Sequence, residues 1–209
     1  MNIADGETIM FTGDSITDCG RSRPLGQGEG LGSGYVSLVD SSWAAGSPGH
    51  RIRVLNTGIS GNRVTDLEER WQRDVLAHGP DWLSVLIGIN DVWRRVDEPW
   101  DPGAVTIERF EEVYRRLLER ARPGLTGLVM MTPFVIEPDR AERMRSMMDR
   151  YGAVVRRMAD EFDAVLVDVQ GAFDAYLQHR PARSLAEDRV HPNQTGHMII
   201  ARAMMEAVS

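Results

Sequence analysis

Short apolar segments alternate along the chain with longer amphipathic segments. The apolar segments have the length of strands and are rich in β-branched residues, which predicts strands buried on both faces. They cover residues 8–12, 52–56, 82–89, 126–132 and 164–169. Between them, apolar residues recur every three or four positions, with arginine and acidic residues on the opposite side, as expected for helices. These predicted helices cover residues 34–45, 63–78, 104–122, 139–162 and 193–207.

The regular alternation of strand and helix predicts the fold class. Strands that are separated by helices form parallel sheets, with the helices packed on both faces. We therefore expect an α/β protein with a flavodoxin-like doubly wound three-layer fold and about five parallel strands. In such sheets the functional site lies beyond the carboxyl ends of the strands.

The length of the chain and its composition agree with one globular domain. A single hydrophobic core remains efficient up to roughly 250 residues, and the chain has 209. Hydrophobic residues make up 42% and charged residues 26%, which argues against a largely disordered chain. We expect residues 1–209 to form a single domain.

Charge and hydropathy exclude two classes of partner. The net charge is −7, and all 24 basic residues are arginines that are interspersed with acidic residues. No basic stripe is present, so we expect no nucleic-acid partner. No apolar segment is long enough to span a membrane, and the N-terminal residues lack the features of a signal peptide. These features predict a soluble, cytoplasmic protein with no membrane partner.

A glycine-rich segment, residues 20–34, follows the first predicted strand. Its composition predicts a loop with neither helix nor strand. It could be a flexible linker, but its position beside the first strand favours a wall of the site or a subunit contact. Together with exposed aromatic side chains, this segment favours a homo-oligomer. The single cysteine, Cys19, excludes an internal disulfide and a structural zinc site, and we expect it to be buried and unreactive.

The candidate chemistry starts with Ser15, which stands on the turn that leaves the first strand. A serine hydroxyl needs an imidazole to accept its proton and a carboxylate to orient that imidazole. Asp188 and His191 are three residues apart, so Asp188 can bind one ring nitrogen of His191 while the other faces Ser15. Pro192 and Asn193 predict the start of the last helix, whose positive end keeps the resting imidazole neutral.

Three groups are candidates for the oxyanion hole of an acyl-transfer reaction. They are the backbone N–H of Ser15, the backbone N–H of Gly61 after the second strand, and the side-chain amide of Asn90 after the third strand. Each segment could also be an ordinary turn or helix cap. Their occurrence together at the ends of predicted strands favours the functional interpretation.

Several neighbouring residues are secondary candidates. Trp93 and Trp100 follow the asparagine segment and could form a stacking wall for a sugar ring, although a core or interface role is equally consistent. Asp14 is a candidate substrate contact, but hydrogen bonding to backbone N–H groups is the preferred role for Asp14 and Asp91.

Other polar residues near the candidate site have ordinary interpretations. His197 is interpreted as a packing or hydrogen-bonding residue of the last helix. Arg21 and Arg23 could touch substrate or a neighbouring subunit, and the preferred interpretation is that they are solvated surface residues.

Four segments of the chain resemble the conserved blocks of the SGNH (GDSL) hydrolase superfamily. The blocks are Gly13-Asp-Ser-Ile16, Gly61-Asn62, Gly88-Ile-Asn-Asp91 and Asp188-Arg-Val-His-Pro192. By position, the resemblance assigns the four named residues to Ser15, Gly61, Asn90 and His191, with Asp188 as the third triad member. Ile16 replaces the leucine of the GDSL motif, which is a conservative change.

Further segments extend the resemblance to the acetylxylan esterases of this superfamily. The segments are Gly13-Asp-Ser-Ile-Thr-Asp-Cys-Gly-Arg21, Ile87-Gly-Ile-Asn-Asp-Val-Trp-Arg94, Met131-Thr-Pro-Phe134 and Gly196-His-Met-Ile199. The resemblance implies a serine esterase that removes acetyl groups from xylan or xylo-oligosaccharides without metal or cofactor. Two alternatives remain open: a short-chain acyl esterase or thioesterase of broad range, and an inactive carbohydrate-binding protein on the same scaffold.

Overall fold

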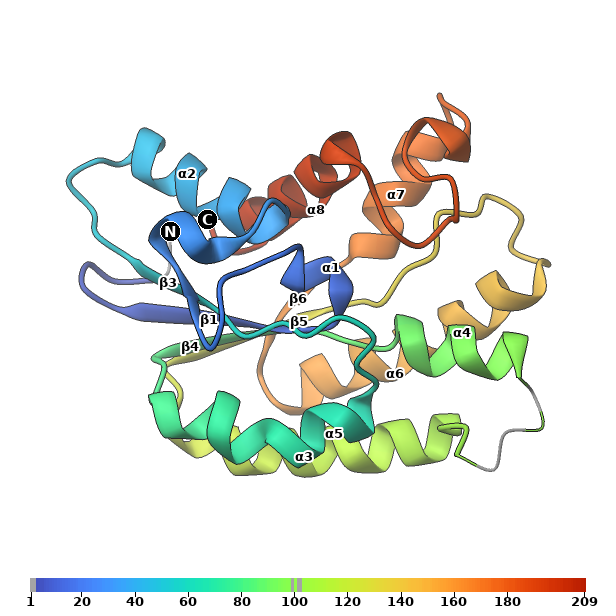
Figure 1. Cartoon of the computed structure of the whole chain (residues 1–209), viewed down its shortest axis with the longest axis horizontal. Coiled ribbons are helices and arrows are strands. Elements are labelled where there is room, and N and C mark those ends of the chain that lie inside the picture. Colours follow the sequence, from blue (N-terminus) through green and yellow to red (C-terminus); the bar gives the residue numbers. More distant parts are fainter. Residues whose placement is uncertain (1–2, 99, 101–102) are drawn as a thin grey trace.

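The centre of the molecule is a six-stranded sheet, seen in a computed structural model that describes residues 3–98, 100 and 103–209 (Figure 1). The strand order is β2-β3-β1-β4-β5-β6. The strands are β1 (Thr8–Gly13), β2 (Gly26–Gln27), β3 (Arg53–Asn56), β4 (Trp82–Leu86), β5 (Gly127–Met131) and β6 (Val165–Val167). All neighbouring pairs are parallel except β2 and β3, which are antiparallel. The five parallel strands confirm the predicted α/β class.

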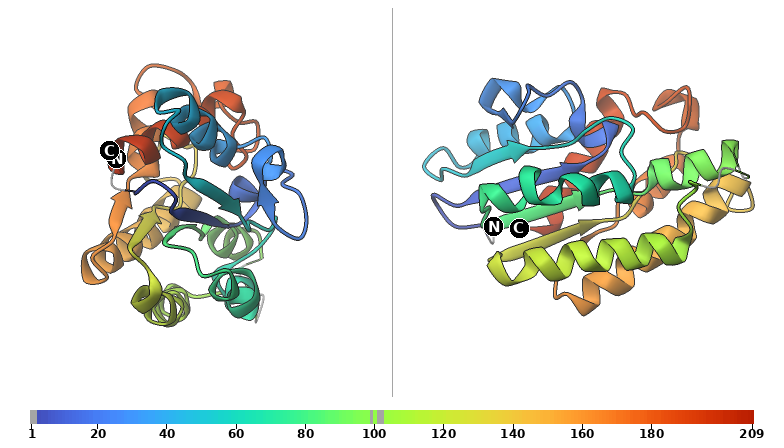
Figure 2. Two further views of the ribbon diagram at one scale, coloured as in Figure 1. Left: turned by 90° about the vertical axis from the view of Figure 1, so that its left-hand side faces the viewer. Right: turned by 60° about the horizontal axis from the view of Figure 1, so that its bottom comes forward.

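Helices cover both faces of this sheet (Figure 2). Helix α8 contacts α2 and α7 on one face, whereas α5 contacts α3 and α6 on the other, and α4 contacts α6. The helices are α1 (Ser15–Asp18), α2 (Tyr35–Gly46), α3 (Val64–Asp74), α4 (Ile89–Asp97), α5 (Ile107–Ala121), α6 (Arg143–Glu161), α7 (Val169–Leu177) and α8 (Gln194–Ala207). Short 3₁₀ turns are Gly28–Leu31, Leu76–His78, Arg122–Gly124 and Ala182–Ser184. None of the helices in the described ranges is both long and apolar enough to cross a membrane.

The hydrophobic pattern explains why these elements form. Every residue of β4 and β5 is buried, as expected for central strands between two helical layers. In α5, the apolar residues at helical spacing face inward, including Phe110, Leu117 and Leu118. The helix begins at the N-cap Thr106, whose side chain accepts a hydrogen bond from the N–H of Arg109.

The sheet topology determines where the site lies. The chain passes from β1 outward to β3 and then returns to β4 on the other side of β1. In α/β proteins of this kind, ligands bind outside the carboxyl ends of the strands at such a reversal, which here lies between β1 and β4, next to β3. The segments after these three strands carry Ser15, Gly61 and Asn90.

Three details of the predicted elements are wrong. The glycine-rich segment 20–34 is not free of regular structure, because it contains a 3₁₀ turn and β2, which forms the edge of the sheet by pairing with β3. The predicted strand 82–89 ends at Leu86, and Ile89 already begins α4. Helices α4 and α7 were not predicted. Before α4, the apolar run of the buried strand β4 continues into a buried helix start, so hydropathy shows no boundary. The start of α7 is marked only by the exposed N-cap Asp168.

Candidate active site

The nucleophile turn, which we define as Gly13, Asp14 and Ser15, connects β1 to α1. A side chain at position 13 is excluded, because its Cβ would lie 2.1 Å from the carbonyl oxygen of Leu86. Asp14 is the N-cap of α1 and its carboxylate accepts a hydrogen bond from the N–H of Ile16 at 3.0 Å. The turn therefore presents Ser15 beyond the carboxyl end of β1, with its side chain half-buried.

Ser15, His191 and Asp188 form one chain of hydrogen bonds. The Oγ of Ser15 lies 3.0 Å from Nε2 of His191, although 176 positions separate the two residues. The Nδ1 of His191 lies 2.6 Å from Oδ2 of Asp188. The structure thus brings together the hydroxyl, imidazole and carboxylate in the order that activation of a serine nucleophile requires.

The segment that carries the histidine is fixed by its own backbone. Oδ1 of Asp188 accepts hydrogen bonds from the N–H groups of Val190, at 2.9 Å, and His191, at 2.8 Å. Asn193 caps α8, as predicted, by accepting from the N–H groups of Thr195 and Gly196. Burial raises the pKa of Asp188, but the hydrogen bonds from His191 and Val190 outweigh it and lower the pKa below the ordinary value. Asp188 is therefore ionised at neutral pH.

The three candidate oxyanion donors lie after three neighbouring strands. Gly61 adopts the left-handed φ of 80°. It lies in residues 58–62, which we call the 58–62 turn and in which the N–H of Asn62 donates to the carbonyl of Ile59 at 3.2 Å. The side-chain amide of Asn90 donates one hydrogen bond to the carbonyl of Asn62 at 3.0 Å, which leaves its second N–H for another acceptor. Within the part of the chain that the structure describes, the N–H groups of Ser15 and Gly61 have no hydrogen-bond acceptor.

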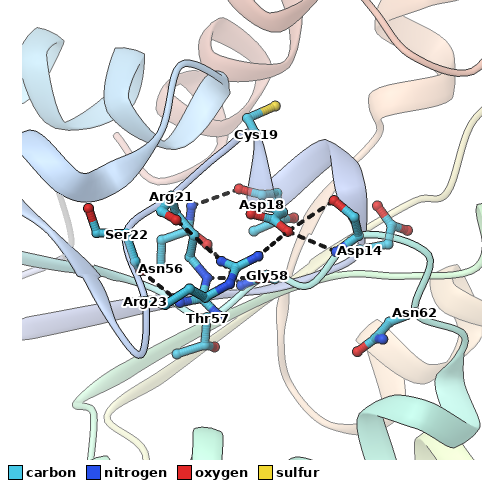
Figure 3. Close-up of polar contacts among 12 residues, drawn as sticks. Asp14, Asp18, Cys19, Arg21, Ser22, Arg23, Asn56, Thr57, Gly58 and Asn62 are labelled. Carbon is cyan, nitrogen blue, oxygen red and sulfur yellow. Dashed lines mark hydrogen bonds and ion pairs between the residues drawn. The ribbon is translucent and has the colours of Figure 1, made fainter.

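A network of charged side chains anchors the 58–62 turn beside the nucleophile turn (Figure 3). Oδ2 of Asp18 accepts from the N–H and the hydroxyl of Ser60, both at 2.9 Å, and from Arg23 at 2.6 Å. Arg21 donates to the carbonyl of Gly58 at 2.7 Å and to that of Pro24 at 2.7 Å.

The network corrects the interpretation of Arg21 as a solvated surface residue, whereas Arg23 is exposed, as that interpretation expects. Arg21 is only 5% exposed, and Arg23 forms an ion pair with the buried Asp18. Both residues belong to the glycine-rich segment 20–34, which therefore lies against the candidate site. The sequence pattern missed this role because an arginine in a glycine-rich loop is normally solvated.

Asp14 and Asp91 are buried carboxylates behind the reacting groups. Both oxygens of Asp91 accept from the N–H of Val64, at 3.2 and 3.3 Å, and hold the start of α3. Burial raises the pKa of each carboxyl to about 7. Asp14 is 1% exposed and its carboxylate accepts from the backbone N–H of Ile16, which agrees with the preferred role of hydrogen bonding to backbone N–H groups.

The two tryptophans lie in different environments. The ring of Trp93 meets that of His191 edge to face, with 5.9 Å between the centroids. Trp100 is 93% exposed, in the connection between α4 and α5. An open cavity of about 500 Å³ adjoins the histidine segment on the protein surface, and it is lined by Arg183, Leu185, Ala186, Glu187, Asp188, His191, Pro192 and Asn193.

His197 and Cys19 connect α8 to the end of α1. Nδ1 of His197 accepts from the N–H of Tyr35 at 3.2 Å, so its Nε2 carries the proton and faces the sulfur of Cys19 at 3.3 Å. Burial lowers the pKa of His197 to about 4 and raises the pKa of Cys19 to about 11. Both groups are neutral at physiological pH, in agreement with the predicted hydrogen-bonding role of His197.

The sequence pattern missed Arg70 and the side chain of Asn62. Arg70 is 5% exposed and donates to groups of two different loops. One signal was present: Arg70 lies between Leu67 and Trp71 on the face of α3 that is buried. An arginine on the apolar face of an amphipathic helix indicates a buried, paired charge.

Comparison with known proteins agrees with this geometry. Residues 11–199 match the model of the GDSL-like lipase/acylhydrolase family, and the chain belongs to this family. The SGNH (GDSL) resemblance and the predicted ester hydrolase class are therefore confirmed.

Individual relatives cover the whole chain. An acetylxylan esterase of Geobacillus stearothermophilus is 47% identical over 211 residues, which span 100% of this chain and 96% of that protein. The crystal structure of Axe2, an acetylxylan esterase from the same organism, superposes with a TM-score of 0.98 over 100% of this chain and 97% of that one, at 47% identity. LAE5, an α/β hydrolase from the metagenome of Lake Arreo, is 45% identical over 100% of this chain and 97% of its own, with a TM-score of 0.97.

Proposed function

We propose that the chain is a serine esterase that removes acetyl groups from acetylated xylan or xylo-oligosaccharides. The observation that carries the proposal is the hydrogen-bonded chain from the hydroxyl of Ser15 through His191 to Asp188. The full-length similarity to an acetylxylan esterase supports the choice of acyl group and sugar. The proposed reaction proceeds through an acetyl-enzyme on Ser15, and residues of the candidate site carry out each step.

In the first half of the reaction, the Oγ of Ser15 attacks the carbonyl carbon of the acetyl ester while Nε2 of His191 takes the hydroxyl proton. The carbonyl oxygen becomes an oxyanion, which accepts hydrogen bonds from the N–H groups of Ser15 and Gly61 and from the amide of Asn90. The tetrahedral intermediate collapses when the bond to the sugar oxygen breaks. His191 gives its proton to that oxygen, and the deacetylated sugar leaves.

In the second half, a water molecule takes the place of the sugar. His191 accepts a proton from this water as its oxygen attacks the acetyl carbon of the acetyl-enzyme. The second intermediate breaks the bond to Ser15, and the proton returns to the serine oxygen. Acetate leaves, and Asp188 stabilises the imidazolium in both halves by its hydrogen bond to Nδ1.

The sugar is proposed to contact Trp93. This ring stands beside His191, which must reach the leaving oxygen, so a sugar bound for reaction lies within reach of the indole. Trp100 stays a candidate for the same wall. Its side chain is almost fully exposed, which also fits a protein interface.

The first test compares Ser15→Ala with wild-type protein. Acetate release from acetylated xylo-oligosaccharides should fall at least about 10⁴-fold, because the residual rate comes from binding and the oxyanion donors alone. Ser41→Ala, an exposed serine on α2, is the matched control and should keep full activity. Undiminished acetate release by a folded Ser15→Ala variant would exclude the acetyl-enzyme.

The two alternatives are separated by substrate and label. A broad esterase or thioesterase would hydrolyse acyl-thioesters or longer acyl esters at least as well as acetylated xylo-oligosaccharides. An inactive carbohydrate-binding protein would bind the sugar but would not react with an organophosphonate at Ser15. We expect stoichiometric labelling of Ser15 and preference for acetylated xylo-oligosaccharides.

Self-association and a cytoplasmic location stay predictions from the sequence. The exposed Trp100 and Met198 are large apolar side chains that an oligomer could cover. Analytical ultracentrifugation would test the first prediction.

A further inference from the structure

Arg70 joins two of the loops that form the candidate oxyanion hole. Its guanidinium donates to the carbonyl of Gly13 at 2.9 Å, in the nucleophile turn, and to that of Thr57 at 2.7 Å, after β3. It also donates to Oδ1 of Asn62 at 2.6 Å, in the 58–62 turn. One buried side chain on α3 therefore contacts the backbone at the end of β1 and both ends of the segment after β3.

Asn62 extends this connection to the third loop. Its side-chain oxygen accepts from Arg70, and its backbone carbonyl accepts from the amide of Asn90 at 3.0 Å. A continuous path of hydrogen bonds thus runs from Gly13 through Arg70 and Asn62 to Asn90. Along this path, Gly13 is two residues from Ser15, and Asn62 follows Gly61 directly. All three proposed oxyanion donors are attached to the same path.

Only a guanidinium can make these contacts together. Its planar fork presents five N–H donors in fixed directions, whereas a lysine ammonium at the same place is a single point. Removal of the charge from water costs free energy. The carbonyl acceptors and Asp74, whose carboxylate lies 3.3 Å from the guanidinium, offset this cost. Desolvation lowers the pKa of Arg70, and the ion pair with Asp74 opposes this effect.

We infer that Arg70 and the side chain of Asn62 are positioning residues, which fix the N–H groups of Ser15 and Gly61 and the amide of Asn90 around one oxyanion. The inference rests on the proposed function, because it assigns to these residues the alignment of the donors used there. Oxyanion stabilisation depends on donors that are placed before the reaction. A displacement of the 58–62 turn should therefore lower kcat and leave substrate binding unchanged.

The decisive variant is Asn62→Ala. It removes the hydrogen bond to Arg70 but keeps the backbone carbonyl that binds Asn90. We expect kcat for acetylated xylo-oligosaccharides to fall about tenfold, with KM changed less than about twofold. Arg70→Lys should show the same split between kcat and KM with a larger loss. Arg73→Lys is the matched control, because Arg73 lies on the same helix, contacts the same Asp74 and is 75% exposed.

A double-mutant cycle separates positioning from general stability. If Asn62 acts through the oxyanion hole, its replacement should cost less in a protein that already carries Asn90→Ala than in wild type, because one of the three donors that it positions is then absent. Equal losses in both backgrounds, or an unchanged kcat in Asn62→Ala, would overturn the inference. If Arg70→Lys does not fold, Asn62→Ala still decides the question. Activity retained by Ser15→Ala would instead refute the proposed function, so the two failures are distinguishable.

Discussion

Replacement of Asp188 by asparagine tests the orientation of the proposed catalytic base. In the structure, one carboxylate oxygen accepts from two backbone N–H groups and the other faces Nδ1 of His191. An asparagine would direct its carbonyl to the two backbone donors, because its amino group cannot accept from them. The amino group would then donate to Nδ1. Nε2 of His191 would carry the ring proton and could not accept the proton of Ser15.

The expected loss follows from two contributions. The charge-assisted hydrogen bond to the imidazolium contributes about 1.5–2 kcal/mol, near the lower end of its usual range, because Asp188 and His191 are 42% and 49% exposed. Recovery of the reactive tautomer requires the hydrogen bond from the asparagine amino group to Nδ1 to break, which costs about 1 kcal/mol. The sum predicts a fall in kcat of about 100-fold for Asp188→Asn. Asp188→Ala loses only the first contribution, so it should be about 20-fold slower than wild type.

Two measurements check this order. Steady-state kinetics of acetate release should rank wild type above Asp188→Ala and Asp188→Ala above Asp188→Asn. Imidazole ¹⁵N chemical shifts at neutral pH should show the Nδ1–H tautomer in wild type and the Nε2–H tautomer in Asp188→Asn. An Asp188→Asn variant within about threefold of wild type, or faster than Asp188→Ala, would refute the tautomer argument.

Three further outcomes are expected. Burial raises the pKa of Asp91 to about 7, above the roughly 3.9 of an unfolded chain, so this carboxyl stabilises the fold fully below about pH 4 and its contribution is lost as the pH rises to 7. In urea unfolding, the free energy of unfolding of wild type should therefore fall by about 2–3 kcal/mol relative to that of Asp91→Asn between pH 5 and pH 8. Parallel pH profiles of the two proteins would contradict this. Burial and the nearby Asp18 and Asp14 raise the pKa of Cys19 to about 11, so a disulfide reagent at pH 8 should react about 10²-fold more slowly with folded than with unfolded protein. Trp93→Ala should raise KM for acetylated xylo-oligosaccharides about fivefold while KM for ethyl acetate stays the same, and equal changes would argue against a sugar contact.

The repeating pattern of apolar segments determined most of the fold. All five parallel strands were predicted within a few residues. The signal is clearest for β4 and β5, because these central strands are buried on both faces and their apolar runs are continuous. The short helix α4 was missed because buried residues continue without interruption from β4 into it. The edge strand β2 was missed because its pairing with β3 is a tertiary contact that a glycine-rich sequence does not show.

For the candidate site, too, one part could be predicted from the sequence and another part depended on the tertiary structure. The types and order of Ser15, Asn90, Asp188 and His191 could be identified from the sequence, because their chemistry depends on residue type and their positions on the ends of strands and helices. Only the tertiary structure determined that the hydroxyl and the imidazole lie 3.0 Å apart across 176 positions. It also determined which charges are buried. In the sequence, Arg70 and Asp14 are recognisable only as charged residues. Their hydrogen bonds to the backbone form only in the folded chain, which removes both side chains from water.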